Sequence, residues 1–184
     1  MAEKKKFEIK RPTRTVSVCL DGDLTAEYEK VLAELQEARR AKIADARLNS
    51  PITRLETRQG ELYAEQEEST LVFTLRGLPR HVWDQLKTDN PPRKDNDLDE
   101  QYGFDSEKLF DAAMKAEGCV VEVTQGGEVV EFTTDNWDEI SGDLTDGQWG
   151  DFVEALSLLN SGKQFVPFSP AGYKKIQASA AKSK

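Results

Sequence analysis

The stretch from Leu71 to Pro92, LVFTLRGLPRHVWDQLKTDNPP, decides the fold because it contains a strand, a helix start and a helix end in the middle of the chain. Residues 70–75 are apolar and β-branched, which predicts a strand, and Gly77 ends it. Pro79 favours the first turn of the following helix, since its φ angle is fixed near the helical value. The helix ends at 90–92, Asn-Pro-Pro, because proline lacks a backbone donor. We therefore expect this stretch to organise both halves of the chain.

The chain before this stretch predicts a strand followed by a helical hairpin. Residues 15–20 alternate apolar and polar side chains, as in a half-buried strand. Residues 24–48 and 52–68 show apolar side chains at helical spacing, with Asp23 or Thr25 as the first N-cap, and the short turn between them predicts antiparallel helices. The apolar seam is too narrow to form a core by itself. The hairpin therefore needs a second surface, which could be the sheet, a second copy of the chain or a partner helix.

The chain after this stretch alternates helices with one β-hairpin. Residues 91–102 are polar and acidic, which predicts a linker or exposed loop. A helix begins at the cap 105–107 and is stopped by Gly118. Residues 119–132 alternate around Gln-Gly-Gly, the strongest hairpin signal in the chain. One helical turn is expected at 136–140, and a final helix follows, ending in the sequence Asn-Ser-Gly.

These patterns predict a predominantly helical α+β protein. A small N-terminal sheet with a long helical hairpin precedes a helical unit that carries the β-hairpin. The expected organisation is a flexible basic arm over 1–14, a first unit over 15–78, a C-terminal unit over 79–162 and a flexible basic tail over 163–184.

The charge is distributed unevenly along the chain. The net charge is −9, yet residues 84–151 hold 19 acidic and 5 basic side chains, a net of −14, so the two ends are basic. An acidic body repels phosphate, which argues against nucleic acid as a partner. No apolar run approaches the roughly 18 residues of a membrane span, and no apolar segment follows the Lys-rich N-terminus. We expect a protein of the cytoplasm that does not bind membranes.

The sequence offers few groups for catalysis or metal binding. His81 is the single histidine, and Cys19 and Cys119 have no CxxC or CxxH neighbour, which favours reduced thiols. No nucleotide-binding glycine motif is present, so we expect no enzyme activity and no cofactor. The acidic run over 95–100 places oxygen ligands at alternate positions. It lacks the glycine and the bidentate glutamate of a calcium loop, and we interpret it as a solvated loop.

Several segments together resemble one protein family. They are CLDGDLTAEYEKVLAEL (19–35), TLRGLPRHVWDQL (74–86), NPPR (90–93), GFDSEKLFDAAM (103–114), LTDGQWGDFVEALSLLN (144–160) and VPFSP (166–170). In order and spacing, these segments are similar to the tail assembly chaperones of long-tailed, siphovirus-type actinobacterial bacteriophages, over roughly 16–170. The hairpin at 119–132 departs from the shorter, more helical link typical there.

The resemblance implies a function without catalysis. Such a chaperone binds the phage tape measure protein, keeps its long amphipathic helices soluble, promotes assembly of the tail-tube protein and leaves the finished particle. It would act in the cytoplasm of the infected host. The sequence does not decide whether the protein forms a homo-oligomer. It also does not decide whether this chain is the short form or a form extended by a ribosomal frameshift, the two lengths in which such chaperones are often produced. Two other interpretations are an acidic DNA mimic that inhibits a host protein, motivated by the −14 segment, and a minor structural protein of the virion.

Large apolar side chains are the candidate partner-binding residues, although the sequence leaves open whether they form only the core. These candidates are Trp83, Leu86, Phe110, Trp149, Phe152, Phe165 and Phe168.

Overall fold

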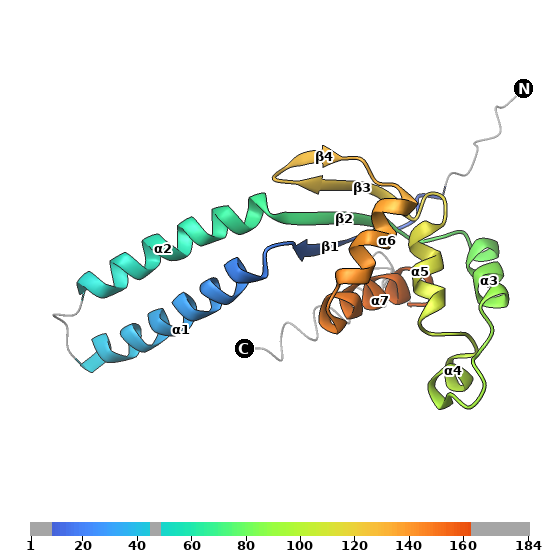
Figure 1. The fold of residues 1–184 in the computed structure, drawn as a ribbon, viewed down its shortest axis with the longest axis horizontal. Helices are drawn as coiled ribbons and strands as arrows, with labels where there is room; N and C mark the ends of the chain where they lie inside the picture. Colours follow the sequence, from blue (N-terminus) through green and yellow to red (C-terminus); the bar gives the residue numbers. More distant parts are fainter. Residues whose placement is uncertain (1–8, 45–48, 163–184) are drawn as a thin grey trace, which may run out of the picture.

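The computed structural model describes residues 9–44 and 49–162, and within these ranges the chain forms seven helices and four strands (Figure 1). In chain order they are β1 (Thr13–Cys19), α1 (Gly22–Ala44), α2 (Asn49–Glu68), β2 (Thr70–Arg76), α3 (Arg80–Asp89), α4 (Asp97–Tyr102), α5 (Lys108–Lys115), β3 (Val120–Gln125), β4 (Glu128–Val130), α6 (Thr134–Asp143) and α7 (Asp146–Asn160). The predicted fold class, α+β and mostly helical, is confirmed.

The four strands form one antiparallel sheet in the order β1-β2-β3-β4. Val16 of β1 pairs with Phe73 of β2, which pairs in turn with Val123 of β3. The predicted β-hairpin is present, and its turn places Gly126 and Gly127 at φ angles of 57° and 82°, which suit glycine. The hairpin was expected in a separate C-terminal unit. Instead it extends the N-terminal sheet, so both halves of the chain share one sheet.

Helices α5, α6 and α7 cover one face of this sheet. Phe73, in the second strand, packs against Trp137 of α6 and Phe152 of α7, with ring centroids 6.1 and 5.1 Å apart. The same core contains Trp83 of α3 and Phe110 of α5, whose ring centroids lie 6.3 Å apart. The opposite sheet face is largely open to solvent, as antiparallel sheets allow. The body therefore has a single core rather than one core for each half.

Helices α1 and α2 pack antiparallel and project away from the body (Figure 1). We call this pair the arm; its base adjoins the sheet and its tip lies at the far end. The helical hairpin is thus confirmed, but its N-cap differs from expectation. The carboxylate of Asp21 accepts hydrogen bonds from the backbone N–H groups of Asp23 and Leu24, at 3.0 and 3.2 Å. Asp21 caps the helix because α1 already begins at Gly22.

The segment predicted as a linker or exposed loop is partly helical. Its second half forms α4, because the side chain of Asn96 accepts a hydrogen bond from Asp99 N–H, and Gly103 adopts the left-handed conformation that ends the helix. Asp99 is fully buried against Arg93. This half is therefore a helix rather than the expected loop, although its side chains other than Asp99 are exposed to solvent as expected.

The N-terminal segment 1–14, which was predicted to be flexible, also contributes to the fold at its C-terminal end. Arg11 donates a side-chain hydrogen bond to the carbonyl of Gly77 at 2.8 Å, and Gly77 N–H donates to the carbonyl of Pro12 at 3.0 Å. Strand β1 therefore begins two residues earlier than predicted. None of the helices in the described ranges is long and apolar enough to cross a membrane.

Candidate partner-binding surface

The structure places most of the predicted binding residues in the core of the body. Trp83, Phe110 and Phe152 are buried there, while Leu86 and Trp149 are half-buried against the same core. Phe165 and Phe168 lie outside the described residues. The first five side chains do not form a surface groove together. Their position agrees with a role in packing, which the sequence had left open.

The arm, by contrast, is thinly packed. Among its described side chains, only four are buried: Val31, Leu35, Ile52 and Leu62. None of them belongs to the core cluster of the body. Apart from its base, where the side chain of Gln125 donates a hydrogen bond to the carbonyl of Glu68, the arm leaves most of its surface exposed to solvent. The need for a second surface, inferred from the sequence, is therefore not met by the sheet.

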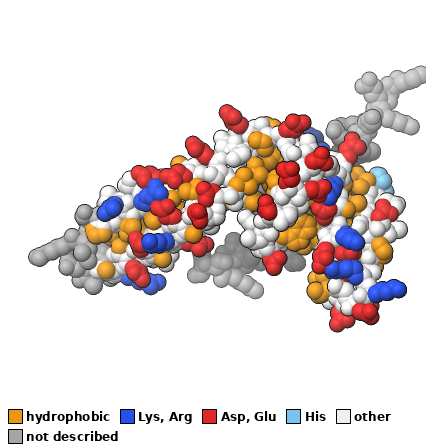
Figure 2. All heavy atoms as spheres, in the orientation of Figure 1, with side chains coloured by type: hydrophobic (Ala, Val, Ile, Leu, Met, Phe, Trp, Pro, Cys, Tyr) orange, Lys and Arg blue, Asp and Glu red, His pale blue; other side chains and the backbone are white. Residues whose placement is uncertain are grey.

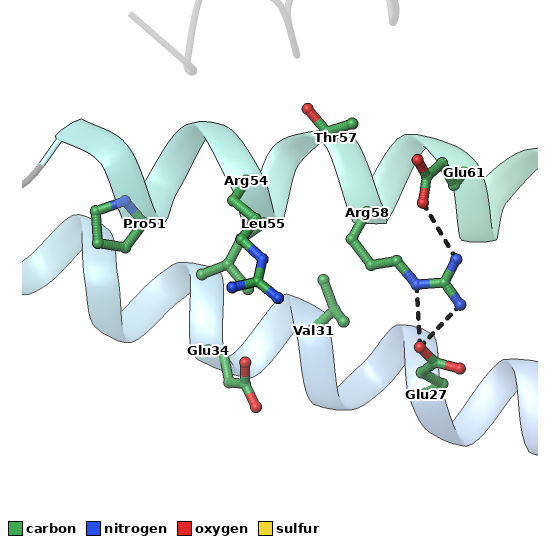
Figure 3. A pocket seen from close by; sticks show the side chains of 9 residues that line it. All are labelled: Glu27, Val31, Glu34, Pro51, Arg54, Leu55, Thr57, Arg58 and Glu61. Atoms are coloured by element: carbon green, nitrogen blue, oxygen red, sulfur yellow. Dashed lines mark hydrogen bonds and ion pairs between the residues drawn. The ribbon is translucent and has the colours of Figure 1, made fainter.

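An open groove runs along one side of the arm, between α1 and α2 (Figure 3). Its volume is about 1020 Å³. The apolar part of its lining comes from Val31 on α1 and from Pro51 and Leu55 on α2. Its polar lining consists of Glu27, Glu34, Arg54, Thr57, Arg58 and Glu61. We call this feature the arm groove. An apolar strip between charged rims is the surface that an amphipathic helix would match.

Arg58 is surrounded by carboxylates near the base of the arm. Its guanidinium contacts Glu27 at 2.9 Å, Glu61 at 3.2 Å and Glu65 at 3.1 Å. These hydrogen bonds, with that of Glu27 contributing most, raise the pKa of Arg58 above its ordinary value. One cation among three carboxylates leaves a local excess of two negative charges. The base end of the groove is therefore acidic.

Two charged residues of the groove have no ion pair within the described residues. They are Arg54, nearer the tip on α2, and Glu34 on α1. Both are exposed, and both line the groove in Figure 3. Exposed charges do not need partners in water, but here they stand beside an apolar strip. They are available to charged groups of a bound molecule.

The two arm helices also contact each other outside the groove lining, where Arg39 forms an ion pair with Glu56 at 2.9 Å. The side chain of Gln59 donates a hydrogen bond to the hydroxyl of Tyr28, and that of Gln66 donates to Thr25. Tyr63 lies beside them and is 63% exposed. Contacts between the arm helices are therefore not confined to the groove.

Sequence reasoning missed the groove because it depends on the register between two helices. The sequence places Glu27 and Glu34 seven residues apart, and Arg54 and Arg58 four apart, so each pair lies on one face of its helix. That spacing was a usable signal. Which α1 residue lies opposite which α2 residue depends on the loop between the helices, and helical periodicity does not specify it.

The other chemical groups in the described residues are accounted for by the fold. Asp99 accepts hydrogen bonds from Arg93 at 2.6 and 3.1 Å and from the Ser106 hydroxyl at 2.7 Å, and Arg93 above all lowers the pKa of this carboxyl well below its usual range. Burial raises the pKa of Cys119 to about 12, which keeps it a thiol. Within the ranges that the structure describes, no three His, Cys, Asp or Glu side chains are grouped to hold a metal ion.

Acidic side chains are spread along the arm and over the body, with lysines and arginines among those of the arm, on the face shown in Figure 2. This face carries no single dense array of carboxylates. A scan against protein-family models, a search of curated proteins and a search of solved structures each found no significant match.

Proposed function

We propose that the protein is a phage tail assembly chaperone, which binds the tape measure protein without catalysis, keeps it soluble and promotes assembly of the tail tube in the cytoplasm of the infected host. The observation that supports this proposal is the arm. It projects from the body and carries a groove in which an apolar strip lies between charged rims. The resemblance of several segments to this family points in the same direction.

The physical argument concerns amphipathic helices. A long protein built from them aggregates when its apolar stripes are exposed to water. A two-helix arm can cover one such stripe by adding it as a third helix, because three helices enclose an apolar seam better than two. Burial of apolar area contributes about 25 cal/mol per Å², so a few covered side chains suffice for reversible binding. Reversibility suits a chaperone that leaves the finished particle.

The body holds the two ends of the arm together. Leu20 N–H donates a hydrogen bond to the carbonyl of Ser69 at 2.9 Å, directly between the end of β1 and the start of β2. The arm therefore begins and ends at adjacent points of a packed sheet. It can be removed by joining Asp21 to Glu68 through a two-residue turn, without deleting any residue of the body core.

The experiment compares the full chain with this armless variant. Each is co-expressed with the tape measure protein encoded by the same phage, and the soluble fraction of that partner is measured by sedimentation and immunoblotting. The full chain should raise the soluble fraction and co-purify with the partner. The armless variant should melt cooperatively, which shows that the body is folded, but should not keep the partner soluble. Absence of any effect by the full chain would refute the proposal.

A further inference from the structure

On the basis of the proposed function, we infer that the arm groove binds a single helix with one basic flank, which faces α1. The N-terminus of this helix lies at the base of the arm and its C-terminus lies at the tip. The inference goes beyond the proposed function because it specifies the chemistry and direction of the bound segment. It rests on the length of the groove, its apolar floor and the distribution of its charges.

The length of the groove suits a short helical segment. Its lining on α2 extends from Pro51 to Glu61. At 1.5 Å per residue these ten steps cover about 15 Å, or about three helical turns. The floor at Val31 and Leu55 can receive apolar side chains at i, i+3 or i+4, and i+7 of the partner. A third helix in this position would pack against both arm helices.

The rims favour basic side chains on one flank of the partner. The rim formed by α1 presents only carboxylates to the groove. They are Glu34, which forms no ion pair within the described residues, and Glu27, which also contacts Arg58 at 2.9 Å; the two lie two helical turns apart. Lysine or arginine residues seven positions apart in the partner would match them. On the opposite rim Arg54 has no ion pair within the described residues, so a carboxylate of the partner fits there. Charge complementarity thus favours a helix that is basic on the flank facing α1 over one that is acidic on that flank.

The direction of the bound helix follows from the uneven charge along the groove. The acidic excess around Arg58 lies at the base end, where Glu27, Glu61 and Glu65 converge. Nearer the tip, the charges of Arg54 and Glu34 balance. The N-terminus of a helix carries the equivalent of about half a positive charge, and its C-terminus the corresponding negative charge. The partner helix is therefore most stable with its N-terminus at the base, parallel to α1.

The first test measures, by fluorescence anisotropy, how tightly the full chain binds a synthetic 18-residue amphipathic peptide. Leucine forms its apolar stripe, lysine lies on the flank that faces α1, and the opposite flank is uncharged. A matched peptide carries glutamate in place of lysine. The lysine peptide should bind at least tenfold more tightly, and its affinity should fall as salt is raised. Equal binding of the two peptides would overturn the charge argument.

Matched variants locate the binding site. Replacing both rim carboxylates, E27Q/E34Q, should weaken binding of the lysine peptide about three- to tenfold, since exposed ion pairs are individually weak. E34Q alone removes no existing ion pair of the described structure and should still weaken binding. The control, E29Q/E37Q, removes two exposed carboxylates of the same helix that do not line the groove. If the control variant weakened binding as much as E27Q/E34Q does, the lysine peptide would not be binding in the groove.

The direction of the bound peptide along the arm is determined from paramagnetic broadening in NMR spectra of the full chain. A nitroxide at the peptide N-terminus should broaden the amide signals of Glu27 and Glu61, whereas one at its C-terminus should broaden those of Glu34 and Arg54. The reverse pattern, or equal broadening from both ends, would overturn the inferred direction.

Co-expression separates this inference from the proposed function. If the full chain keeps the tape measure protein soluble and E27Q/E34Q does so equally well, the groove assignment fails while the chaperone function stands. If the full chain never captures that protein, the proposed function fails, whatever the peptide measurements show.

Discussion

The backbone N–H of Leu78 donates a hydrogen bond to Oδ1 of Asn160 over 2.7 Å, across 82 residues of sequence. Asn160 is the last residue of α7, and its Nδ2 also donates to the carbonyl of Leu156 at 2.9 Å. Beside this bond Gly77 lies so close to Leu159 that an added Cβ would stand 3.0 Å from its carbonyl oxygen. The turn after β2 and the end of the last helix are therefore locked together.

Replacing Asn160 should weaken the body. Asn160→Ala leaves the N–H of Leu78 without its partner, and the expected loss of unfolding free energy is about 1–2 kcal/mol. Urea denaturation at neutral pH measures it. Ser157→Ala, on the same helix, removes a hydroxyl that makes no side-chain hydrogen bond in the described residues, and should change stability by less than about 0.5 kcal/mol. Equal stability of the two variants would contradict the role assigned to Asn160.

Stability should fall in acid because of Asp99. The guanidinium of Arg93, followed by Ser106, holds the pKa of this carboxyl below its ordinary value. A group whose pKa is depressed by folding contributes stability that is complete above the unfolded pKa of about 3.9 and is lost as the pH falls toward the folded pKa. Asp99→Asn should therefore lower the free energy of unfolding at pH 7. It should also make that free energy fall less steeply below about pH 4 than in the unaltered protein.

The measurement is urea denaturation at a series of pH values from 7 to 2. Asp97→Asn is the control, because Asp97 is exposed and forms no ion pair within the described residues. If the free energy of unfolding of the Asp99→Asn variant fell as much in acid as that of the unaltered protein, another group would be responsible for the pH dependence.

Gly60 and Gly103 should respond to alanine in opposite directions. Gly60 lies inside α2 with open space around it, so Gly60→Ala should stabilise the arm by about 0.5–1 kcal/mol. Gly103 has equal space, but its φ angle is 79°, a conformation that alanine disfavours, so Gly103→Ala should destabilise the protein by about 1 kcal/mol. Thermal melting of both variants, with hydrogen exchange of the α2 amides, distinguishes these outcomes. A change of melting temperature in the same direction for both variants would contradict this explanation.

The single core predicts cooperative unfolding of the body. Phe73 is fully buried between Phe132, Trp137 and Phe152, and Phe73→Ala should cost about 3–5 kcal/mol. Tryptophan fluorescence and circular dichroism should still report one common transition. Val129→Ala, at a side chain that is 69% exposed, is the control and should be nearly neutral. Separate unfolding transitions for the two halves would contradict the single core and would support the two units, 15–78 and 79–162, that were predicted from the sequence.

Local patterns predicted the elements of the fold well. The alternating strand β1, the apolar strand β2 and the Gly-Gly turn of the hairpin are all present. In the turn that leads into α5, the Asp105 carboxylate accepts hydrogen bonds from the N–H groups of Glu107 and Lys108, although the N-cap position itself is Glu107. Each depends on residues close together in sequence. The pairing of β3 with β2 does not, because it joins strands about 50 residues apart and shifts register at Thr74 and Leu75. Periodicity specifies the faces of a strand but not its neighbour.

The candidate site was harder to predict for a related reason. Large aromatic side chains such as Trp83 and Phe152 attract attention as binding residues, yet the energy of burying them makes them core residues first. The groove is built from ordinary charged residues, Glu27, Glu34 and Arg54, whose sequence pattern equally suits a solvated helix face. Their grouping arises only when the two helices pack.

The central claim is that the arm groove holds a helical partner, and hydrogen exchange measured by mass spectrometry on the purified complex with the tape measure protein tests it most directly. Amides within 27–34 of α1 and 51–61 of α2 should exchange more slowly in the complex than in the free protein, while the strands and α5 to α7 should change little. Slower exchange confined to the body, with the two arm segments unchanged, would contradict the claim.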